Sequence, residues 1–362
     1  MVNSNIVARK GDSLRIALLH ADLPNESKGG VAHQTHHLAN SFVERGHSVT
    51  VITFSPSFDE CLYAVETISR PNIPRAADSF GYAFALTRVD FSRFDIIHAM
   101  GDNYLIGSNN RPPLVRTMHG SAKDELRTAE SLKRKLFQAV LVPLETLGAV
   151  RADYVTGISE ATRARVPQVR EIIANGVDLG RFTPAALTNK ESAPTLLFVG
   201  TKTGRKRGQW LADMWSRDIK PFLPEGATLW SVADAPLEGD GIVNHGRVPL
   251  ETLTNLFRRA WAFCLPSTYE GFGVPYIEAF ASGTAVIASP NPGAVEVTQN
   301  GKFGIVAQDD RIAGEIVSVL TDASRRDALV QAGLRRVTEY DWQRISAQYE
   351  EIFHSLIGAR KH

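Results

Sequence analysis

The stretch Tyr-Glu-Gly-Phe-Gly-Val-Pro-Tyr-Ile-Glu-Ala, residues 269–279, combines the signs of a strand end, a tight loop and a helix start. Gly271 and Gly273 lack a Cβ, so the backbone can adopt positive φ or approach a ligand closely. Pro275 suits the first position of a helix, where its missing N–H costs nothing. This succession of strand, glycine loop and helix is typical of the ligand-binding edge of an α/β sheet.

Two carboxylates, Glu270 and Glu278, flank this loop, and two interpretations are open for them. In the structural interpretation Glu278 lies in the first helical turn and stabilises the helix dipole, by roughly 0.3–1 kcal/mol. Glu270 is harder to explain in this way, because a helix already supplied with Glu278 gains little from a carboxylate before the loop. In the functional interpretation both carboxylates bind a ligand.

Length and composition limit the classes of protein that need to be considered. The chain has 362 residues, which predicts two domains, and its 43% hydrophobic and 22% charged residues are typical of a soluble globular protein. A net charge of +1 gives no reason to expect nucleic acid as a partner. Cys61 and Cys264 form no disulfide framework or zinc spacing, which fits a reducing cytoplasm. The sequence has neither a signal-peptide pattern before Gly11 nor an apolar run of the roughly 18–20 residues that span a membrane.

Short apolar runs of strand length alternate with helical patterns along the whole chain. The runs are continuous rather than alternating, as in strands buried on both faces of a parallel sheet. The predicted strands are 14–21, 48–55, 95–100, 114–120, 153–159 and 171–176 in the first half, and 195–201, 227–233, 241–246, 260–267, 284–289 and 304–307 in the second.

This alternation predicts βαβ units and a doubly wound sheet in each half, with the polar segment 183–194 as the linker. We therefore expect an α/β protein with two Rossmann-like domains that face a central cleft. Ligands bind at the carboxyl ends of the strands in such sheets.

A glycine pair, Gly29 and Gly30, lies between the first strand and an amphipathic helical pattern that ends near Gly46. Its backbone N–H groups can bind a phosphate at the helix N-terminus, although glycine pairs are also common in ordinary loops. The spacing is not G-x-G-x-x-G, so a nicotinamide cofactor is disfavoured.

A basic loop follows the first strand of the second half. The strand ends at Gly200, and Arg205, Lys206 and Arg207 precede a helical pattern. Basic side chains beside a helix N-terminus suit a pyrophosphate, whereas the alternative is a solvated charge cluster. The loop lacks G-x-x-x-x-G-K-[ST], so it is not the phosphate loop of nucleoside triphosphatases.

Three polar residues end strands of the first half. His119 is predicted to lie at the cleft, where Gly120 permits close approach of a ligand. His98 has a similar position, and we interpret it as structural. Ser159 is interpreted as the N-terminal cap of the next helix.

Five segments, in this order, resemble retaining GT-B glycosyltransferases of family 4. They are GGVAH with LANSFVERGHSVTV (29–33 and 38–51), TMHG (117–120), NGVDLGRFTP (175–184), VGT with RK (199–201 and 205–206), and the long segment 266–289 around the opening stretch. The resemblance covers the chain from about Leu14 to the C-terminal helix. Its most specific element is the pair of glutamates, Glu270 and Glu278, separated by seven residues.

The resemblance implies roles for these residues. Glu270 would hydrogen-bond hydroxyls of the donor sugar, and Glu278 would bind the ribose of the nucleotide. Lys206, with Arg205, would neutralise the diphosphate, and His119 would lie beside the transferred sugar. The remaining donor-binding positions that it implies are Gly29, Gly30, Gly200, Phe272, Gly273 and Val274.

One departure from the family pattern concerns the basic loop. Many relatives carry arginine directly after the glycine of VG, where this chain has Thr201. Basic charge is placed at Arg205 and Lys206 instead, so the partner of Lys206 is left open.

The resemblance further implies transfer of a hexose-type sugar from a UDP- or GDP-sugar with retention, the acceptor attacking on the face from which the diphosphate leaves. Cations and backbone N–H groups would stabilise the charge that develops on this leaving group. No paired-Asp motif is evident, so neither a metal nor another cofactor is expected. Glu270 is not assigned as a covalent nucleophile.

Other functions share parts of this pattern. A sugar-nucleotide epimerase has the same two-domain plan but need not transfer to an acceptor. A non-catalytic sugar-nucleotide-binding protein would bind donor without transfer or hydrolysis. A phosphorylase would need a pyridoxal phosphate lysine and a much longer chain.

The expected domains are residues 1–186, which would bind the acceptor, and 187–344, which would bind the nucleotide sugar. A C-terminal helix at about 345–362 would pack back on the first domain, as the resemblance implies. The acceptor is left open as a glycan, in polysaccharide biosynthesis, a lipid-linked saccharide or a small molecule.

Residues 126–150 combine Lys133, Arg134 and Lys135 with an apolar run. This segment is either an ordinary amphipathic helix with a basic rim or a peripheral contact with an anionic membrane. We expect a cytoplasmic protein, peripheral at the inner face of the membrane in the second case.

Overall fold

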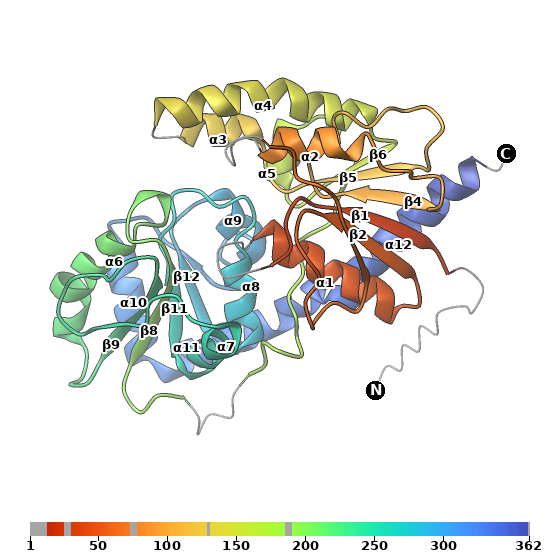
Figure 1. Ribbon diagram of the computed structural model, residues 1–362. Helices are drawn as coiled ribbons and strands as arrows, with labels where there is room; N and C mark the ends of the chain where they lie inside the picture. Colours follow the sequence, from red (N-terminus) through yellow and green to blue (C-terminus); the bar gives the residue numbers. More distant parts are fainter. Residues whose placement is uncertain (1–12, 25–29, 73–77, 129–130, 185–189, 361–362) are drawn as a thin grey trace. The chain divides into compact units, whose positions relative to one another are not determined.

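The structure is a computed structural model that describes residues 13–24, 30–72, 78–128, 131–184 and 190–360 (Figure 1). The chain divides into two compact units, Met1–Gly176 with Trp342–His362, and Val177–Asp341. Each unit is built on a sheet in which all strand pairs are parallel, which confirms the predicted fold class.

The unit boundaries differ from the expected positions after residues 186 and 344. Val177 already belongs to the second unit, where its N–H donates to the carbonyl of Tyr340 at 2.9 Å. Phe182 packs against Phe257, with ring centroids 6.0 Å apart. These contacts bind the residues before the polar segment 183–194 to the second unit, and residues 185–189 of that segment lie outside the described residues.

The first unit contains a seven-stranded sheet in the order β3-β2-β1-β4-β5-β6-β7. Six of its strands lie within the predicted runs. The seventh, β3, escaped prediction because it is an edge strand of mixed polarity with no buried residue. The strands are β1 (Arg15–Leu19), β2 (Ser48–Thr53), β3 (Ala64–Thr67), β4 (Ile96–Ala99), β5 (Leu114–Met118), β6 (Tyr154–Gly157) and β7 (Glu171–Ile172).

Helices pack on both faces of this sheet because successive residues of a strand point to opposite faces. Ile16 and Leu18 of β1 belong to one buried cluster, and Ala17 and Leu19 belong to another. The helices of the unit are α1 (Val31–Glu44), α2 (Asp78–Leu86), α3 (Ala122–Thr128), α4 (Leu132–Arg151), α5 (Glu160–Arg165) and α12 (Trp342–Ala359).

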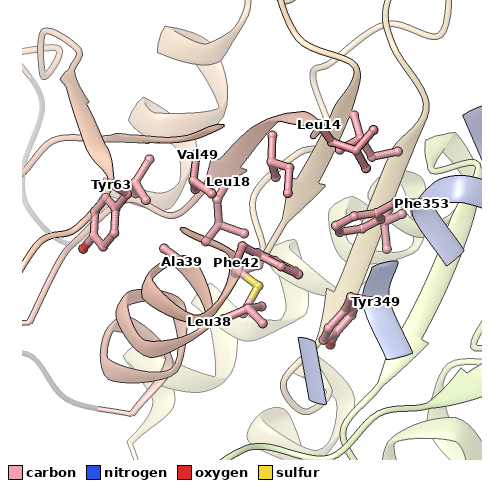
Figure 2. Packing of buried hydrophobic residues seen from close by; sticks show 14 of the residues in the cluster. Leu14, Leu18, Leu38, Ala39, Phe42, Val49, Tyr63, Tyr349 and Phe353 are labelled. Carbon is pink, nitrogen blue, oxygen red and sulfur yellow. The ribbon is translucent and has the colours of Figure 1, made fainter. Parts of the chain in front are cut away.

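The C-terminal helix α12 is part of the core of the first unit. Tyr349 and Phe353 pack their rings against Phe42 of α1, with centroids 6.5 and 5.5 Å away (Figure 2). Leu18 of β1 and Leu38 of α1 belong to the same buried cluster. Burial of these apolar side chains explains why α12 (Trp342–Ala359) folds onto the first unit.

The second unit contains a six-stranded sheet in the order β10-β9-β8-β11-β12-β13, and every strand lies within a predicted run. The strands are β8 (Thr195–Gly200), β9 (Thr228–Ala233), β10 (Ile242–Asn244), β11 (Ala262–Leu265), β12 (Ala285–Ala288) and β13 (Ile305–Val306). The helices are α6 (Gly208–Met214), α7 (Leu250–Arg259), α8 (Val274–Ala281), α9 (Pro292–Thr298), α10 (Ile312–Thr321) and α11 (Ala323–Val337), with short turns η3 (Gly204–Lys206), η4 (Trp215–Ile219), η5 (Lys220–Phe222) and η6 (Thr338–Tyr340).

Local signals also placed several caps correctly. The hydroxyl of Ser159 accepts from the N–H of Thr162 at the start of α5. Gly46, with φ of 94°, follows α1 and donates its N–H to the carbonyl of Val43. Within the part of the chain that the structure describes, no helix is both long and apolar enough to cross a bilayer.

Candidate active site

The topology of the second unit selects one place on its sheet for a ligand. β8 pairs with β9 on one side and with β11 on the other, so the connections diverge between β8 and β11. Ligands of doubly wound sheets bind at the carboxyl ends of such a strand pair. The loops that follow these two strands, 201–207 and 266–273, carry five of the predicted site residues, which are Arg205, Lys206, Glu270, Phe272 and Gly273.

The basic loop after β8 is shaped by glycine. A Cβ on Gly200 would lie 2.6 Å from Cζ of Phe198 and 3.0 Å from Cδ of Lys206, so the glycine makes room for both side chains. Gly204 begins η3 with φ of 70°, which favours glycine. The carbonyl of Arg205 accepts from the N–H of Thr268 at 2.9 Å, which joins the basic loop to the loop after β11.

Glu270 is the partner of the two predicted cations. Its carboxylate is buried, 6% exposed, and accepts from the Ser267 hydroxyl at 2.7 Å. Lys206 Nζ lies 3.4 Å from Oε1 of Glu270, and Arg205 Nη1 lies 3.4 Å from Oε2. Arg205 also donates to the carbonyl of Tyr269 at 2.7 Å. The partner of Lys206, which the sequence left open, is therefore a carboxylate on the neighbouring loop.

Arg207, the third basic residue of the loop, is held in the framework of the unit. Its guanidinium donates to both carboxylate oxygens of Asp309 at 2.7 Å and to the hydroxyl of Ser289 at 2.9 Å. The guanidinium carbon also lies 4.1 Å from the ring centroid of Trp210. The two other cations, Arg205 and Lys206, are the ones beside Glu270.

Glu278 has a different environment from the one predicted. It is the fifth residue of α8, and the first turn of that helix contains no acidic residue. The expected stabilisation of the helix dipole from the first turn is therefore wrong, as is the first-turn position of Glu278. Pro275 occupies the second helical position rather than the first, because α8 begins at Val274.

Burial raises the pKa of Glu278 to about 7, and the nearby charge of Lys206 acts in the opposite direction. A carboxyl group that is this costly to ionise is a poor choice for stability alone, and perturbed groups of this kind cluster at functional sites. Lys206 thus interacts with both glutamates, one on each side of the glycine loop.

The glycine loop leads into the N-terminus of α8. Gly273 caps the helix with φ of 86°, and a Cβ there would overlap the ring of Tyr276. Val274 is the first helical residue. The side chain of Phe272 is buried, with its ring 5.6 Å from that of Tyr340, so this residue has only its backbone to offer a ligand.

Residues that the sequence reasoning missed hold this loop in place. Asn291 Nδ2 donates to the carbonyl of Ser267 at 3.1 Å and to the hydroxyl of Tyr276 at 3.2 Å. The N–H of Gly293 donates to the carbonyl of Glu270 at 2.9 Å. The Asn-Pro-Gly sequence at the start of α9 is a recognisable helix-start signal, but nothing local shows that it supports a loop more than twenty residues earlier.

His119 lies in the first unit, at the end of β5. Both ring nitrogens are buried. Burial, and then the charges of His20 and Arg116, lower the pKa of His119 to about 3. The ring is therefore neutral at physiological pH and has one donor and one acceptor for a ligand. Gly120, with φ of 150°, has no atom within 4 Å of an added Cβ.

The glycine pair and His98 are the other positions that the sequence analysis considered in the first unit. Gly30 caps α1 with φ of 59° and borders open space, whereas Gly29 lies outside the described residues. His98 is buried in β4, where its Nε2 is 2.8 Å from the Thr117 hydroxyl and its ring lies 4.5 Å from that of Tyr349. These contacts agree with the structural interpretation of His98.

A polar group at the strand ends of the first unit was also missed. Asp102 follows β4 with φ of 51° and bonds to the hydroxyl of Ser79. Burial raises the pKa of Asp102, and the charges of Arg116 and His20 oppose that shift. The sequence signal for Asp102 is a polar residue beside a glycine, Gly101, at the end of a buried strand. His119, beside Gly120, was predicted from the same kind of signal.

Comparison with known proteins places this geometry in a family. The model of Glycosyltransferase Family 4 matches residues 28–181, and that of Glycosyl transferases group 1 matches residues 231–336. The chain is 26% identical over 378 residues to phosphatidyl-myo-inositol mannosyltransferase of Mycolicibacterium smegmatis, with 91% of each chain covered.

Two solved structures have the same fold. Sucrose-phosphate synthase from Thermosynechococcus elongatus matches with a TM-score of 0.79 and 20% identity, over 96% of this chain and all of that one. The Anabaena protein HepE, solved with UDP-glucose, matches with a TM-score of 0.72 and 16% identity, over 94% of this chain and all of that one. Two family models matched in order, together with the two parallel sheets and the paired glutamates, show that this chain belongs to the group 1, family 4 glycosyltransferases of GT-B fold.

Proposed function

We propose that this glycosyltransferase moves a hexose-type sugar from a nucleoside-diphosphate sugar to a hydroxyl acceptor, with retention of configuration and without a metal ion. The observation that carries the proposal is the position of Lys206, 3.4 Å from Glu270 and close enough to Glu278 to alter its pKa. A donor diphosphate is the ligand that this arrangement of cations, carboxylates and helix N-terminus suits best.

The cations and the helix would act on the leaving group. As the glycosidic bond breaks, negative charge develops on the diphosphate, and groups already fixed around it stabilise the transition state more than the ground state. Lys206, Arg205 and the amino end of α8 supply positive charge from both loops of the site. Donors of this kind contribute roughly 2.7–4 kcal/mol each in well-studied oxyanion sites.

The two carboxylates would act on different parts of the donor. Glu270 precedes the glycine loop and accepts a hydrogen bond from Ser267, and it would also accept hydrogen bonds from sugar hydroxyls. Glu278 follows the loop inside α8 and would accept from the ribose. The pyrophosphate would then lie between them, at the start of the helix. UDP-glucose, which HepE binds, has the chemistry that this division requires.

The acceptor would bind at the strand ends of the first unit. His119 is neutral there and has its ring nitrogens buried beside Arg116 and His20. The attacking hydroxyl would approach on the face that the diphosphate leaves, and the departing phosphate would take its proton. The mannosyltransferase relative is named for a lipid acceptor, and a lipid-linked saccharide, a soluble glycan and a small molecule all offer the hydroxyl group required.

A screen of sugar nucleotides tests the proposal. The protein is incubated with UDP-, GDP- and ADP-sugars, and slow release of nucleoside diphosphate identifies the donor. Acceptors are then tried with that donor, and the anomeric configuration of the product is read by NMR. We expect one donor class to be hydrolysed and the new linkage to keep the donor configuration. An inverted product would overturn retention.

The two rival functions give different outcomes in the same screen. An epimerase would convert the sugar of the donor without any transfer, which is visible as an altered sugar in the recovered material. A non-catalytic binding protein would bind the nucleotide but release no diphosphate from any donor. Transfer to an acceptor excludes both.

A further inference from the structure

The side chain of Arg207 connects the loops that follow four strands of the second unit. Arg207 itself follows β8, and its Nε donates to the carbonyl of Pro266, after β11, at 2.7 Å. Its other nitrogens donate to the hydroxyl of Ser289, after β12, at 2.9 Å and to both carboxylate oxygens of Asp309, after β13, at 2.7 Å. These four strands are consecutive neighbours in the sheet. One guanidinium therefore holds together the loops along a continuous part of the carboxyl edge, beside the candidate donor site.

The backbone of Arg207 has a conformation that arginine seldom adopts. Its φ of 54° and ψ of 41° lie in the left-handed region, which glycine enters freely and asparagine or aspartate enter more readily than arginine. A residue in such a conformation persists where the surrounding structure fixes it, and such residues cluster at functional sites. Glycine would satisfy the backbone without strain, so we attribute the arginine at this position to its side chain.

Arg207 also determines how the two cations of the site are held. It directly follows Lys206, and its N–H donates to the carbonyl of Gly204 at 3.2 Å, which closes the turn η3 that contains Arg205 and Lys206. On the other side, the carbonyl of Arg207 accepts from the N–H of Leu211 at 3.1 Å, at the start of α6. The direction of the Lys206 side chain therefore depends on how the next residue of the chain is anchored.

We propose that Arg207 and Asp309 are positioning residues that fix the basic loop so that Lys206 faces the leaving diphosphate. The inference rests on the proposed function for that role of Lys206, and neither Arg207 nor Asp309 would itself contact the donor. The planar fork of arginine matches both oxygens of a carboxylate, which the single ammonium of lysine does not. Hydrogen bonds from Arg207 lower the pKa of Asp309, so the carboxylate is ionised at neutral pH.

Three variants of the full chain test the pair by the initial rate of donor hydrolysis at saturating donor. Arg207→Gly keeps the backbone conformation and removes the guanidinium, Arg207→Lys keeps the charge without the fork, and Asp309→Asn removes the charge at nearly constant size. Each should lower turnover about tenfold or more, because a displacement of about 1 Å can reduce a rate about a hundredfold. The matched control is Asp218→Asn, since Asp218 pairs with Arg217 at 2.7 Å away from the site and should keep the wild-type rate. A wild-type rate for Arg207→Lys or Asp309→Asn would overturn the proposal.

A double-mutant cycle separates positioning from a general structural role. If Arg207 acts through Lys206, then Arg207→Gly should have little further effect in a Lys206→Ala protein, because the group that it positions is already absent. We expect a further loss below about threefold. The same cycle is measured with Asp309→Asn, whose half-exposed side chain spares the core if Arg207→Gly unfolds the protein. An equal loss in both backgrounds would mean that the pair supports the unit in general, which would overturn the proposal.

A titration without turnover distinguishes failure of this inference from failure of the proposed function. The charge of Lys206 lowers the pKa of Glu278 against the effect of burial. If Asp309→Asn displaces Lys206, the pKa of Glu278 should rise, whereas the same change in a Lys206→Ala protein should leave that pKa unaltered. The carboxyl band in infrared spectra recorded over a range of pH follows this titration, and Glu278→Gln identifies its signal. An unchanged pKa would overturn the positioning role, whereas a raised pKa with wild-type turnover would contradict the role of Lys206 in the proposed reaction.

Discussion

Lys206 Nζ lies 3.4 Å from the Oε1 atom of Glu270, although the two residues come from loops that follow different strands. The contact joins the loop after β8 to the loop after β11 at the point where the sheet connections diverge. Arg205 of the same loop lies 3.4 Å from the other carboxylate oxygen of Glu270, so two cations of the first loop meet one carboxylate of the second.

Lys206→Ala should lower turnover at least about tenfold, because a cation beside the leaving diphosphate stabilises the transition state. The measurement is the initial rate of transfer or of donor hydrolysis at saturating donor. Lys202→Ala is the matched control, since Lys202 lies in the same loop but pairs with the exposed Glu238 at 2.7 Å. Activity of the Lys206 variant within twofold of wild type would contradict the assigned role.

Substitutions of Glu270 and Glu278 should have different effects on the binding of free nucleoside diphosphate. Glu278→Ala should weaken binding of free nucleoside diphosphate about tenfold or more, since a hydrogen bond to a charged group contributes roughly 1.5–3 kcal/mol. Glu270→Gln should leave that binding nearly intact but impair transfer and discrimination between sugar epimers. Calorimetric titration of both variants with nucleoside diphosphate and with intact donor distinguishes them. If Glu270→Gln loses binding of free nucleoside diphosphate and Glu278→Ala keeps it, then the sugar and ribose roles assigned to the two residues are reversed.

Glu278 should also make stability depend on pH. The pKa of Glu278 is about 7 in the folded protein, and 4.5 is its ordinary value in an unfolded chain. Between these two pH values the folded state holds a proton that the unfolded state releases. The resulting stabilisation is present below pH 4.5 and is lost as the pH rises through 7. Glu278→Gln cannot ionise, so its free energy of unfolding relative to wild type should rise by roughly 1–2 kcal/mol from pH 5 to pH 8. This figure is below the full value of the pKa shift because Glu278 is only partly buried.

Thermal unfolding of both proteins at the two pH values measures this difference. The difference in free energy of unfolding between variant and wild type is compared at pH 5 and at pH 8. Other titrating groups are common to the two proteins, so their effects cancel in this comparison. An equal stability difference at pH 5 and at pH 8 would show that the carboxyl group of Glu278 ionises normally in the folded protein.

Activity should survive a strong chelator. Among the residues that the structure describes, no three or more histidine, cysteine, aspartate or glutamate side chains are grouped to hold a metal ion. The cations beside Glu270 would take the place that a divalent ion occupies in other transferases. The assay compares initial rates with excess chelator and with added magnesium or manganese. A complete loss that either metal restores would refute metal independence.

Gly293→Ala should damage catalysis through the loop rather than through a reacting group. A Cβ on Gly293 would lie 2.5 Å from the carbonyl oxygen of Phe272 and 3.0 Å from that of Glu270, so the loop must move. Gly314→Ala is the control, because its Cβ would meet no atom within 4 Å and alanine favours a helix. We expect a lower turnover for the first variant and a wild-type rate for the second, with both proteins folded by circular dichroism.

The strands and the fold class followed from local patterns. Continuous apolar runs identified twelve strands, and the signal is clearest in strands such as β4, β5, β11 and β12, where every residue is buried. The edge strand β3 escaped for the opposite reason, since its residues are only partly covered and its composition is mixed. Caps such as Ser159 were also predictable, because a helix start depends on neighbouring residues alone.

The sequence by itself therefore determined two parallel α/β sheets and the residue types at their strand ends, while the tertiary structure decided what those residues do together. Glycine spacing predicted a loop, but only the packed chain pairs Lys206 with Glu270, ties Arg207 to Asp309 and places Asn291 and Gly293 behind the loop. Secondary structure depends on neighbours within a few residues, whereas ion pairs and burial depend on groups far apart in the chain. The raised pKa of Glu278 has the same origin, because it depends on how completely the fold removes that carboxylate from water.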